Sequence, residues 1–226
     1  MIVWRCEDVE DMDIEGVSDL YVRSFLTNDE FRETDTHFRC QSGKGSWNWR
    51  MKFPLKLPLE VHRATVQIWD RDYLSRNDFI AEAAFDFEEL AKEAWVENRR
   101  VKMKGVGEEN ESNSEKFWVG CKKRNSEGDF EDGGKVLISF ELVPKERAEA
   151  CVVGEGRDAP NVDPFLPPPI GRFEWSWNPL KLISQMCGPE FKLKICLALC
   201  CVLCLLILVF IFPMFFSDAF AVLIFE

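Results

Sequence analysis

Histidine is scarce in this chain of 226 residues, which contains only His37 and His62. The sequence also lacks the GxSxG, HExxH and phosphate-loop patterns, since the GKGS segment at 43–46 has no glycine at the required distance before it. These absences remove the common routes to nucleophilic, zinc-dependent and phosphoryl-transfer catalysis. We therefore expect a protein that is not an enzyme.

Positive charge is also in short supply. Lysine and arginine number 28 against 39 aspartates and glutamates, which gives a net charge of −11. The four charged residues beyond position 190 cancel, so the acidic excess lies in residues 1–190. Nucleic acid requires a basic surface, so we expect no nucleic acid partner. An anionic membrane could be bound only with a cation between it and the protein.

Cysteine is frequent, with nine residues, but it lacks a pattern. No CxxC pair with a partner pair occurs, and this argues against a structural zinc site. Unpatterned cysteines are typical of a reducing compartment, so we expect the first 190 residues to face the cytosol.

One long apolar run, residues 195–216, contains no charge. About 20 apolar residues span a bilayer as a helix. Lys181, Lys192 and Lys194 precede the run, and only Asp218 and Glu226 follow it, which by the positive-inside rule leaves residues 1–190 in the cytosol. The sequence therefore predicts a single-pass protein with a C-terminal transmembrane helix at 191–216 and a short extracytosolic tail at 217–226.

The first 145 residues read as an all-β domain. Apolar or alternating runs of strand length recur between turn signals, at 2–6, 20–26, 36–40, 47–53, 64–70, 79–87, 116–121 and 135–143. A short helix is expected near 88–95, and acidic surface loops at 105–114 and 124–134. Eight strands over this length predict an antiparallel β-sandwich. Residues 146–190 are rich in proline and then in aromatics, which predicts an extended linker to the membrane.

Aspartates gather in two of the loops. Asp70, Asp72 and Asp78 lie between the fifth and sixth strands, and Asp13 and Asp19 lie between the first and second. Alternate loops of a sandwich meet at the same end, so the five carboxylates can converge. Ca²⁺ takes six to eight oxygen ligands in flexible geometry and would relieve their repulsion.

Four other interpretations of the same residues were considered, and three of them stay open. An EF-hand is excluded, because Ser75 and Ala81 occupy the positions that require glycine and glutamate. A solvated acidic loop needs no ion, Mg²⁺ would use fewer protein ligands, and a two-carboxylate hydrolase would need a cleft with one acid of raised pKa.

The two loops and their flanking segments, SDLYV and QIWDRD, resemble the calcium-binding loops of C2 domains. The strand order is similar to the type II arrangement of that family. The resemblance implies that Asp13, Asp19, Asp70, Asp72 and Asp78 bind two or three Ca²⁺ ions, which then bind anionic phospholipid. Apolar loop residues are expected to enter the membrane: Met12, Ile14, Val17, Tyr73 and Leu74. Arg50 and Lys52 are expected on one strand face, either as a headgroup site or merely solvated.

The segment TDTHFRCQSGKGSWNWRMKFPL, the segment GRDAPNVDP and the Trp-rich stretch before the apolar run resemble the C-terminal portion of a ferlin. Ferlins are large tail-anchored proteins with several C2 domains. The resemblance implies a role in vesicle fusion, exocytosis or membrane repair, at the plasma membrane or intracellular vesicles, with membrane-fusion proteins as further partners. It also implies that this chain is a piece of a longer protein. A calcium-independent, tail-anchored scaffold that binds protein partners is the alternative.

Overall fold

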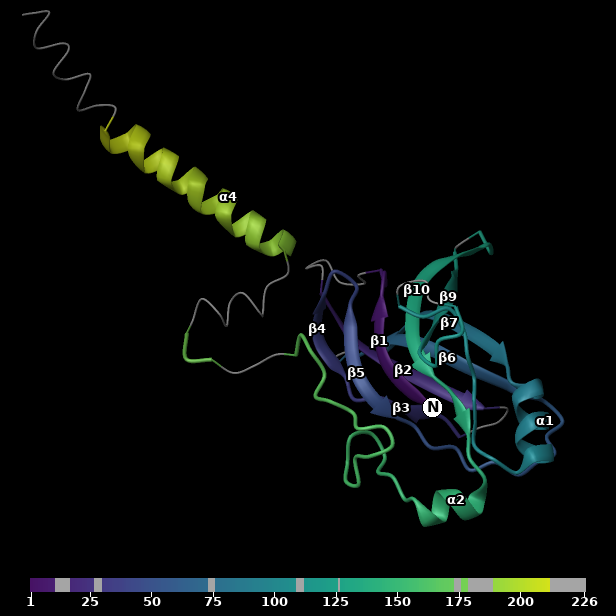
Figure 1. The fold of residues 1–226 in the computed structure, drawn as a ribbon. Coiled ribbons are helices and arrows are strands. Elements are labelled where there is room, and N and C mark those ends of the chain that lie inside the picture. The colour runs from purple at the N-terminus through teal and green to yellow at the C-terminus, as the bar shows by residue number, and fades with distance from the viewer. Residues whose placement is uncertain are drawn as a thin grey trace, which may run out of the picture.

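The computed structural model describes residues 1–10, 17–26, 30–72, 76–108, 112–125, 127–172, 176–178 and 189–211. These contain eleven strands and three α-helices, the last of which continues into a π-helical segment (Figure 1). The strands are β1 Ile2–Glu7, β2 Val17–Leu26, β3 Arg32–Glu33, β4 His37–Gln41, β5 Gly45–Arg50, β6 Arg63–Asp70, β7 Asp78–Asp86, β8 Val101–Lys102, β9 Phe117–Arg124, β10 Phe130–Ser139 and β11 Glu141–Leu142. The helices are α1 Glu88–Glu97, α2 Lys145–Ala150 and α4 Pro189–Leu206, and the π-helical segment is Ile207–Ile211.

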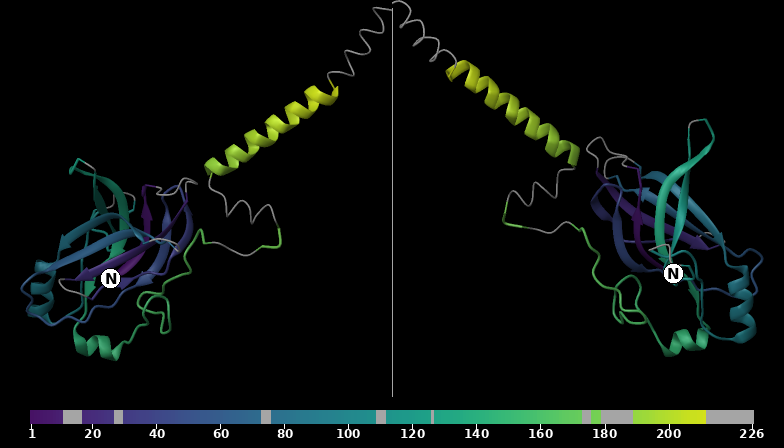
Figure 2. Two further views of the ribbon diagram at one scale, coloured as in Figure 1. Left: turned by 180° about the vertical axis from the view of Figure 1, so that it is seen from behind. Right: turned by 45° about the horizontal axis from the view of Figure 1, so that its top comes forward.

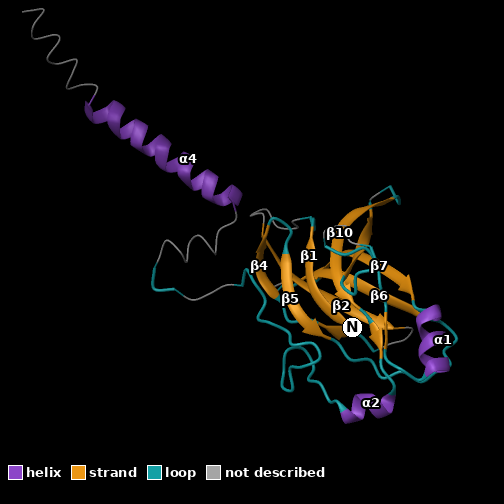
Figure 3. Ribbon diagram, viewed as in Figure 1, coloured by secondary structure: helices purple, strands orange, loops and turns teal. Residues whose placement is uncertain are grey.

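Nine of these strands form one antiparallel sheet in the order β3-β2-β6-β7-β9-β10-β1-β5, with β4 also paired to β2. The link between β7 and β9 is a single registered pair, Glu82 with Lys122. The sheet curls there, so that its two halves face each other as the layers of a sandwich (Figure 3). Strands β8 and β11 form a small separate pair.

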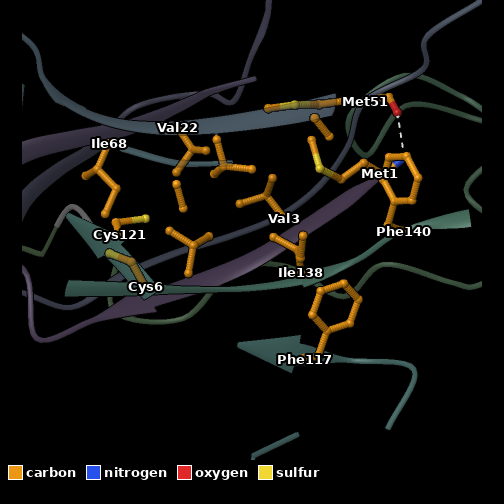
Figure 4. Close-up of a cluster of buried hydrophobic side chains, with 14 of the residues drawn as sticks. Met1, Val3, Cys6, Val22, Met51, Ile68, Phe117, Cys121, Ile138 and Phe140 are labelled. Atoms are coloured by element: carbon orange, nitrogen blue, oxygen red, sulfur yellow. Dashed lines mark hydrogen bonds between the residues drawn. The ribbon is translucent and has the colours of Figure 1, made fainter. Parts of the chain in front are cut away.

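Alternation along the strands produces the core between the two halves. Val22 and Ile68 come from one half, and Val3, Cys6 and Ile138 from the other, and all five are fully buried in one cluster (Figure 4). The register of β1 shifts between Val3 and Arg5. On the outer face of β1 and β10, Ile2, Trp4 and Leu137 form a second small cluster.

The predicted all-β fold is confirmed, and the strand count of eight is corrected to eleven. The extra strands β3, β8 and β11 have two residues each, which is too short to show an alternating pattern. Strand β10 begins at Phe130, inside a stretch predicted to be loop. Its first residues pair with a basic segment of β9, Glu131 opposite Lys123 and Asp132 opposite Lys122, and such cross-strand charge pairs stabilise a hairpin without apolar alternation.

Four connections begin or end at one end of the sandwich. Their described residues are 8–10, 42–44, 71–72 with 76–77, and 125 with 127–129. The first two approach each other closely, since the Val9 N–H donates to the Gly43 carbonyl at 3.2 Å. Gly43 has φ +63°, and a Cβ there would lie 2.0 Å from the Val9 oxygen, so only glycine fits. We call this the acidic end. The β9–β10 hairpin projects here (Figure 2), with Phe130 72% exposed.

The opposite end carries α1 and α2 (Figures 1 and 3). The predicted helix near 88–95 is confirmed as α1, which buries Leu90, Ala91 and Ala94 against the core. The extended linker predicted at 146–190 begins instead as helix α2, because KERAEA has no proline or glycine to break a helix. Residues 152–172 contain no helix, as predicted, but they follow the surface of the sandwich rather than leaving it (Figure 1). We call residues 152–172 the strap.

Helix α4 projects away from the sandwich (Figure 1) and exposes apolar side chains such as Leu197 and Leu203. Across the described residues, no helix combines the length and the apolarity needed to cross a bilayer. Residues 212–216 of the predicted span lie outside the described residues.

Candidate metal centre

Strand pairing brings three of the predicted aspartates to the same level of the acidic end. Leu20 pairs with Asp70 across β2 and β6, and Asp70 pairs with Asp78 across β6 and β7. Asp19 is the neighbour of Leu20, and Asp72 follows Asp70 by two residues. The register thus places Asp19, Asp70 and Asp78 at neighbouring strand ends, with Asp72 two residues beyond Asp70.

Asp19 and Asp70 are tied to each other through the backbone. The Asp19 N–H donates to Asp70 Oδ1 at 2.7 Å, and the Arg71 N–H donates to the Asp19 carbonyl at 2.9 Å. Asp70 is only 4% exposed. A buried carboxylate must be held by donors or by a cation, and here a backbone N–H holds one of its oxygens.

Two β-bulges flank these aspartates. On β2 and β4, Ser18 pairs with Cys40 and Leu20 with His37, so two residues of β4 oppose Asp19 alone. One of them, Arg39, has φ +56°, and its N–H donates to Asp19 Oδ1 at 2.7 Å. The second bulge lies between β6 and β7, next to Asp70. Bulges re-aim side chains and recur beside functional sites.

Asn77 makes two hydrogen bonds beside the aspartates that sequence analysis did not predict. Its Oδ1 accepts the Asp72 N–H at 3.2 Å, and its Nδ2 donates to the Tyr21 hydroxyl at 3.0 Å. Asn77 thus fastens the loop that carries Asp72 to the neighbouring strand β2. An asparagine just before a strand usually signals a turn. That signal does not tell whether its side chain bonds to a neighbouring strand or is solvated.

The side chain of Arg71 turns away from the aspartates. Its guanidinium lies 4.5 Å from the centre of the Tyr21 ring and 3.6 Å from the Glu33 carboxylate. In the described part of the chain, no lysine or arginine forms an ion pair with Asp72 or Asp78. At the same end, Asp8 pairs with Lys135 and Glu10 with Lys123. Asp72 and Asp78 therefore differ from these two carboxylates in having no ion pair among the described residues.

The chemistry of this predicted donor set fits a hard cation such as Ca²⁺, because all five side chains are carboxylates. Among the described residues, however, no three His, Cys, Asp or Glu side chains are grouped closely enough to hold a metal ion. Asp13, the fifth predicted ligand, lies outside the described residues, as do Met12, Ile14, Tyr73, Leu74 and the side chain of Val17. The metal site and the membrane-contact residues stay predictions.

Arg50 and Lys52 lie on one side of the sandwich, where both contact the strap. The Arg50 side chain is 5% exposed and donates to the carbonyls of Val162 and Pro164 at 2.9 and 2.8 Å. Burial lowers the pKa of Arg50 from its usual value. Lys52 Nζ donates to the Val153 carbonyl at 3.0 Å. The strap thus covers Arg50 in this conformation, and the headgroup role stays an untested prediction.

Comparison with known proteins agrees with this arrangement. The sequence model of the C2 domain matches residues 1–102. "Ferlin 1" of Toxoplasma gondii is 32% identical over 171 residues, which cover 74% of this chain and 11% of that protein. Myoferlin of Xenopus tropicalis is 29% identical over 230 residues, which cover 85% of this chain and 12% of that protein.

This chain therefore spans about a tenth of the length of these curated relatives. Among solved structures, a C2 domain of plant extended synaptotagmin 1 matches 62% of this chain and 92% of its own, with 14% identity and a TM-score of 0.40. The sequence similarities support a ferlin-like chain that carries a C2 domain.

Proposed function

We propose that this protein is a membrane-associated C2 protein whose acidic end binds Ca²⁺ and, through it, anionic phospholipid. The observation that carries the proposal is the gathering of Asp19, Asp70, Asp72 and Asp78 on adjacent strand ends. Two or three ions, with Asp13 as the fifth ligand, would reverse the local charge and leave coordination positions for a phosphate or carboxylate oxygen. The chain performs no catalysis in this proposal.

Apolar loop residues would add to the binding. Met12, Ile14, Val17, Tyr73 and Leu74 belong to the two loops that carry the aspartates. Each contributes roughly 1.5–3 kcal/mol at full burial in the bilayer interface. Calcium is required first, because the bare carboxylates repel an anionic membrane.

The C-terminal apolar run at 195–216 supports the membrane part of the proposal. As a transmembrane anchor it would hold the C2 domain in the cytosol at the plasma membrane or at vesicles. The likeness of the chain to ferlins supports a role in vesicle fusion or membrane repair alongside membrane-fusion proteins. The alternative is a calcium-independent, tail-anchored scaffold that binds protein partners.

The test is sedimentation of residues 1–178 with phosphatidylserine vesicles across a calcium titration. This piece contains both hydrophobic clusters and the whole strap. Binding should appear with calcium, and Asp70→Asn/Asp72→Asn should weaken it at least about tenfold, which corresponds to about 1.4 kcal/mol.

Asp158→Asn is the matched control, since this aspartate is exposed and lies in the strap. Its binding should equal that of the unchanged protein. Binding that persists with EGTA, or that is absent at millimolar calcium, would refute the calcium-triggered function and leave the scaffold.

A further inference from the structure

The chain leaves the last long strand at the end of the sandwich opposite the aspartates. Ser139, the final residue of β10, pairs with Ile2 at the start of β1. Helix α2 follows at this far end (Figure 1). A linker that ran directly from α2 to a membrane would therefore point the acidic end away from that membrane.

The strap first attaches beside Arg50. The Gly156 N–H donates to the Arg50 carbonyl at 2.8 Å, and the Arg50 N–H donates back to Gly156 at 3.2 Å, as in an antiparallel bridge. Gly156 has φ +59°, and a Cβ there would lie 2.7 Å from the Trp49 ring. Only glycine permits this close approach.

The middle of the strap is held by burial. Leu166 is 1% exposed and packs in the outer cluster with Ile2, Trp4 and Leu137. The Asn161 side chain brackets it, donating to the Leu166 carbonyl at 2.8 Å and accepting its N–H at 2.9 Å. Leu166 thus forms a third layer over the sheet.

Ion pairs and hydrogen bonds fix the last part of the strap. Asp35 accepts from Arg157 at 2.6 Å and from Arg172 at 2.9 Å. Arg172 also donates to the Ser46 carbonyl at 2.7 Å. The Gly171 carbonyl lies 3.0 Å from His37 Nε2.

The level at which the strap ends can be read from the strand register. His37 pairs with Leu20, and Leu20 pairs with Asp70. Gly171 contacts His37, so the strap has carried the chain from the α2 end up to the level of the aspartates.

Chain length then limits where the apolar helix can lie. Residues 173–188, sixteen in number, separate Arg172 from Pro189. Fully extended, they reach at most about 55 Å. The ten residues of β2 already measure about 33 Å along the sandwich. If the acidic end faced away from the anchoring membrane, residues 173–188 would have to run back along the whole domain. That path would take up most of their extended length.

We propose that the strap makes the domain dock onto the membrane that holds its own C-terminal helix, rather than onto a second membrane. This inference rests on the proposed function, since it takes the apolar run as an anchor and the acidic end as the lipid-binding face. Releasing the strap frees twenty-one further residues, 152–172, and moves the exit to the α2 end. The acidic end can then face a second membrane.

The experiment uses the full chain reconstituted in phosphatidylserine-containing vesicles, with a dye on a cysteine introduced as Phe130→Cys at the acidic end. All variants also carry Cys151→Ser, because Cys151 is a free, exposed thiol near α2 that the dye would label. Energy transfer to an acceptor lipid in the same vesicle reports docking onto the home membrane. Clustering with a second, protein-free population of the same vesicles reports docking between membranes. Both are measured with and without calcium.

Leu166→Asp places a charge in the buried layer and should release the strap. Phe165→Asp is the matched control, because its side chain is 66% exposed. A third variant inserts about 20 Gly and Ser residues after Asn178, which lengthens the tether without touching the strap. With calcium, the unchanged chain and Phe165→Asp should show transfer without clustering. Leu166→Asp and the insertion should show clustering raised several-fold.

The failures of the two proposals are distinguishable. If calcium changes neither signal in any variant, the proposed function is wrong. If calcium raises both signals equally in the unchanged chain, in Leu166→Asp and in the insertion, calcium-dependent lipid binding stands and the strap does not direct it. The insertion keeps the test valid if Leu166→Asp lowers the folded population, which circular dichroism checks.

Discussion

The acidic end and the surface that the strap covers, which we call the strap face, differ in the partners of their carboxylates. At the strap face, Asp35 binds two guanidiniums, and Arg100 binds Glu141 at 2.9 Å and Asp163 at 2.7 Å. At the acidic end, the contacts that the structure shows for the Asp19 and Asp70 carboxylates are to backbone N–H groups. The first arrangement neutralises its charges, and the second concentrates carboxylates.

This difference indicates what each region does. Part-buried pairs between fixed, opposite charges need no further partner, so the strap face is a structural joint. Carboxylates on neighbouring strand ends repel one another, and a bound cation would relieve that repulsion. The comparison predicts that substitutions in the strap change stability, whereas substitutions at the acidic end change calcium affinity.

Leu166→Ala should give the largest effect. Removing a fully buried leucine costs about 2–5 kcal/mol, because contacts are lost and a cavity is left. Urea unfolding of residues 1–178 measures the loss, and Phe165→Ala should change the free energy of unfolding by less than about 1 kcal/mol. Equal effects of the two variants would mean that the strap does not pack as a third layer.

Asn77→Ala should give an intermediate effect, and it should lower calcium affinity more than stability. It removes the clamp between the Asp72 backbone and the Tyr21 hydroxyl. We expect calcium affinity to fall about three- to tenfold, because the loop must then be ordered on binding, while the unfolding free energy changes by about 1 kcal/mol. Calorimetric calcium titration reports the first and urea unfolding the second. Unchanged affinity with lowered stability would assign Asn77 to the fold alone.

His37 should give the smallest effect, which is a dependence of the free energy of unfolding on pH. Burial lowers the pKa of His37 below its usual 6.5, and nearby Arg172 lowers it further, while the Gly171 carbonyl, Asp35 and Asp19 raise it. The Ser46 N–H donates to Nδ1 at 2.9 Å, so the folded imidazole is neutral. The unfolded chain therefore binds more protons below pH 6.5, and stability present above that pH is lost as the pH falls.

The expected slope is at most about 1.4 kcal/mol per pH unit. Urea unfolding between about pH 5 and 8 measures it, and His37→Gln should flatten the profile. A profile of equal slope in His37→Gln would assign the dependence to other groups.

Several features could be predicted from the residues because they depend on local patterns. Apolar alternation placed β1, β6 and β7 within one residue of their observed bounds. The rule that alternate loops share an end placed Asp19, Asp70 and Asp78 at neighbouring strand ends, as their register shows, while their role as ligands stays a prediction. The clamp by Asn77 could not be predicted in this way, because it depends on the distance to Tyr21, 56 positions away in the sequence.

The longer strands and the acidic excess follow from the residues alone, because they depend on short-range periodicity and composition. The path of the strap does not follow from the residues alone. Proline excludes helix from such a segment but leaves its direction open. That direction is set by contacts across more than 100 positions, such as Arg172 with Asp35 and Arg50 with Val162. Arg50 is likewise buried rather than on an exposed strand face, because it donates to carbonyls of the strap. No local pattern in the sequence predicts those contacts.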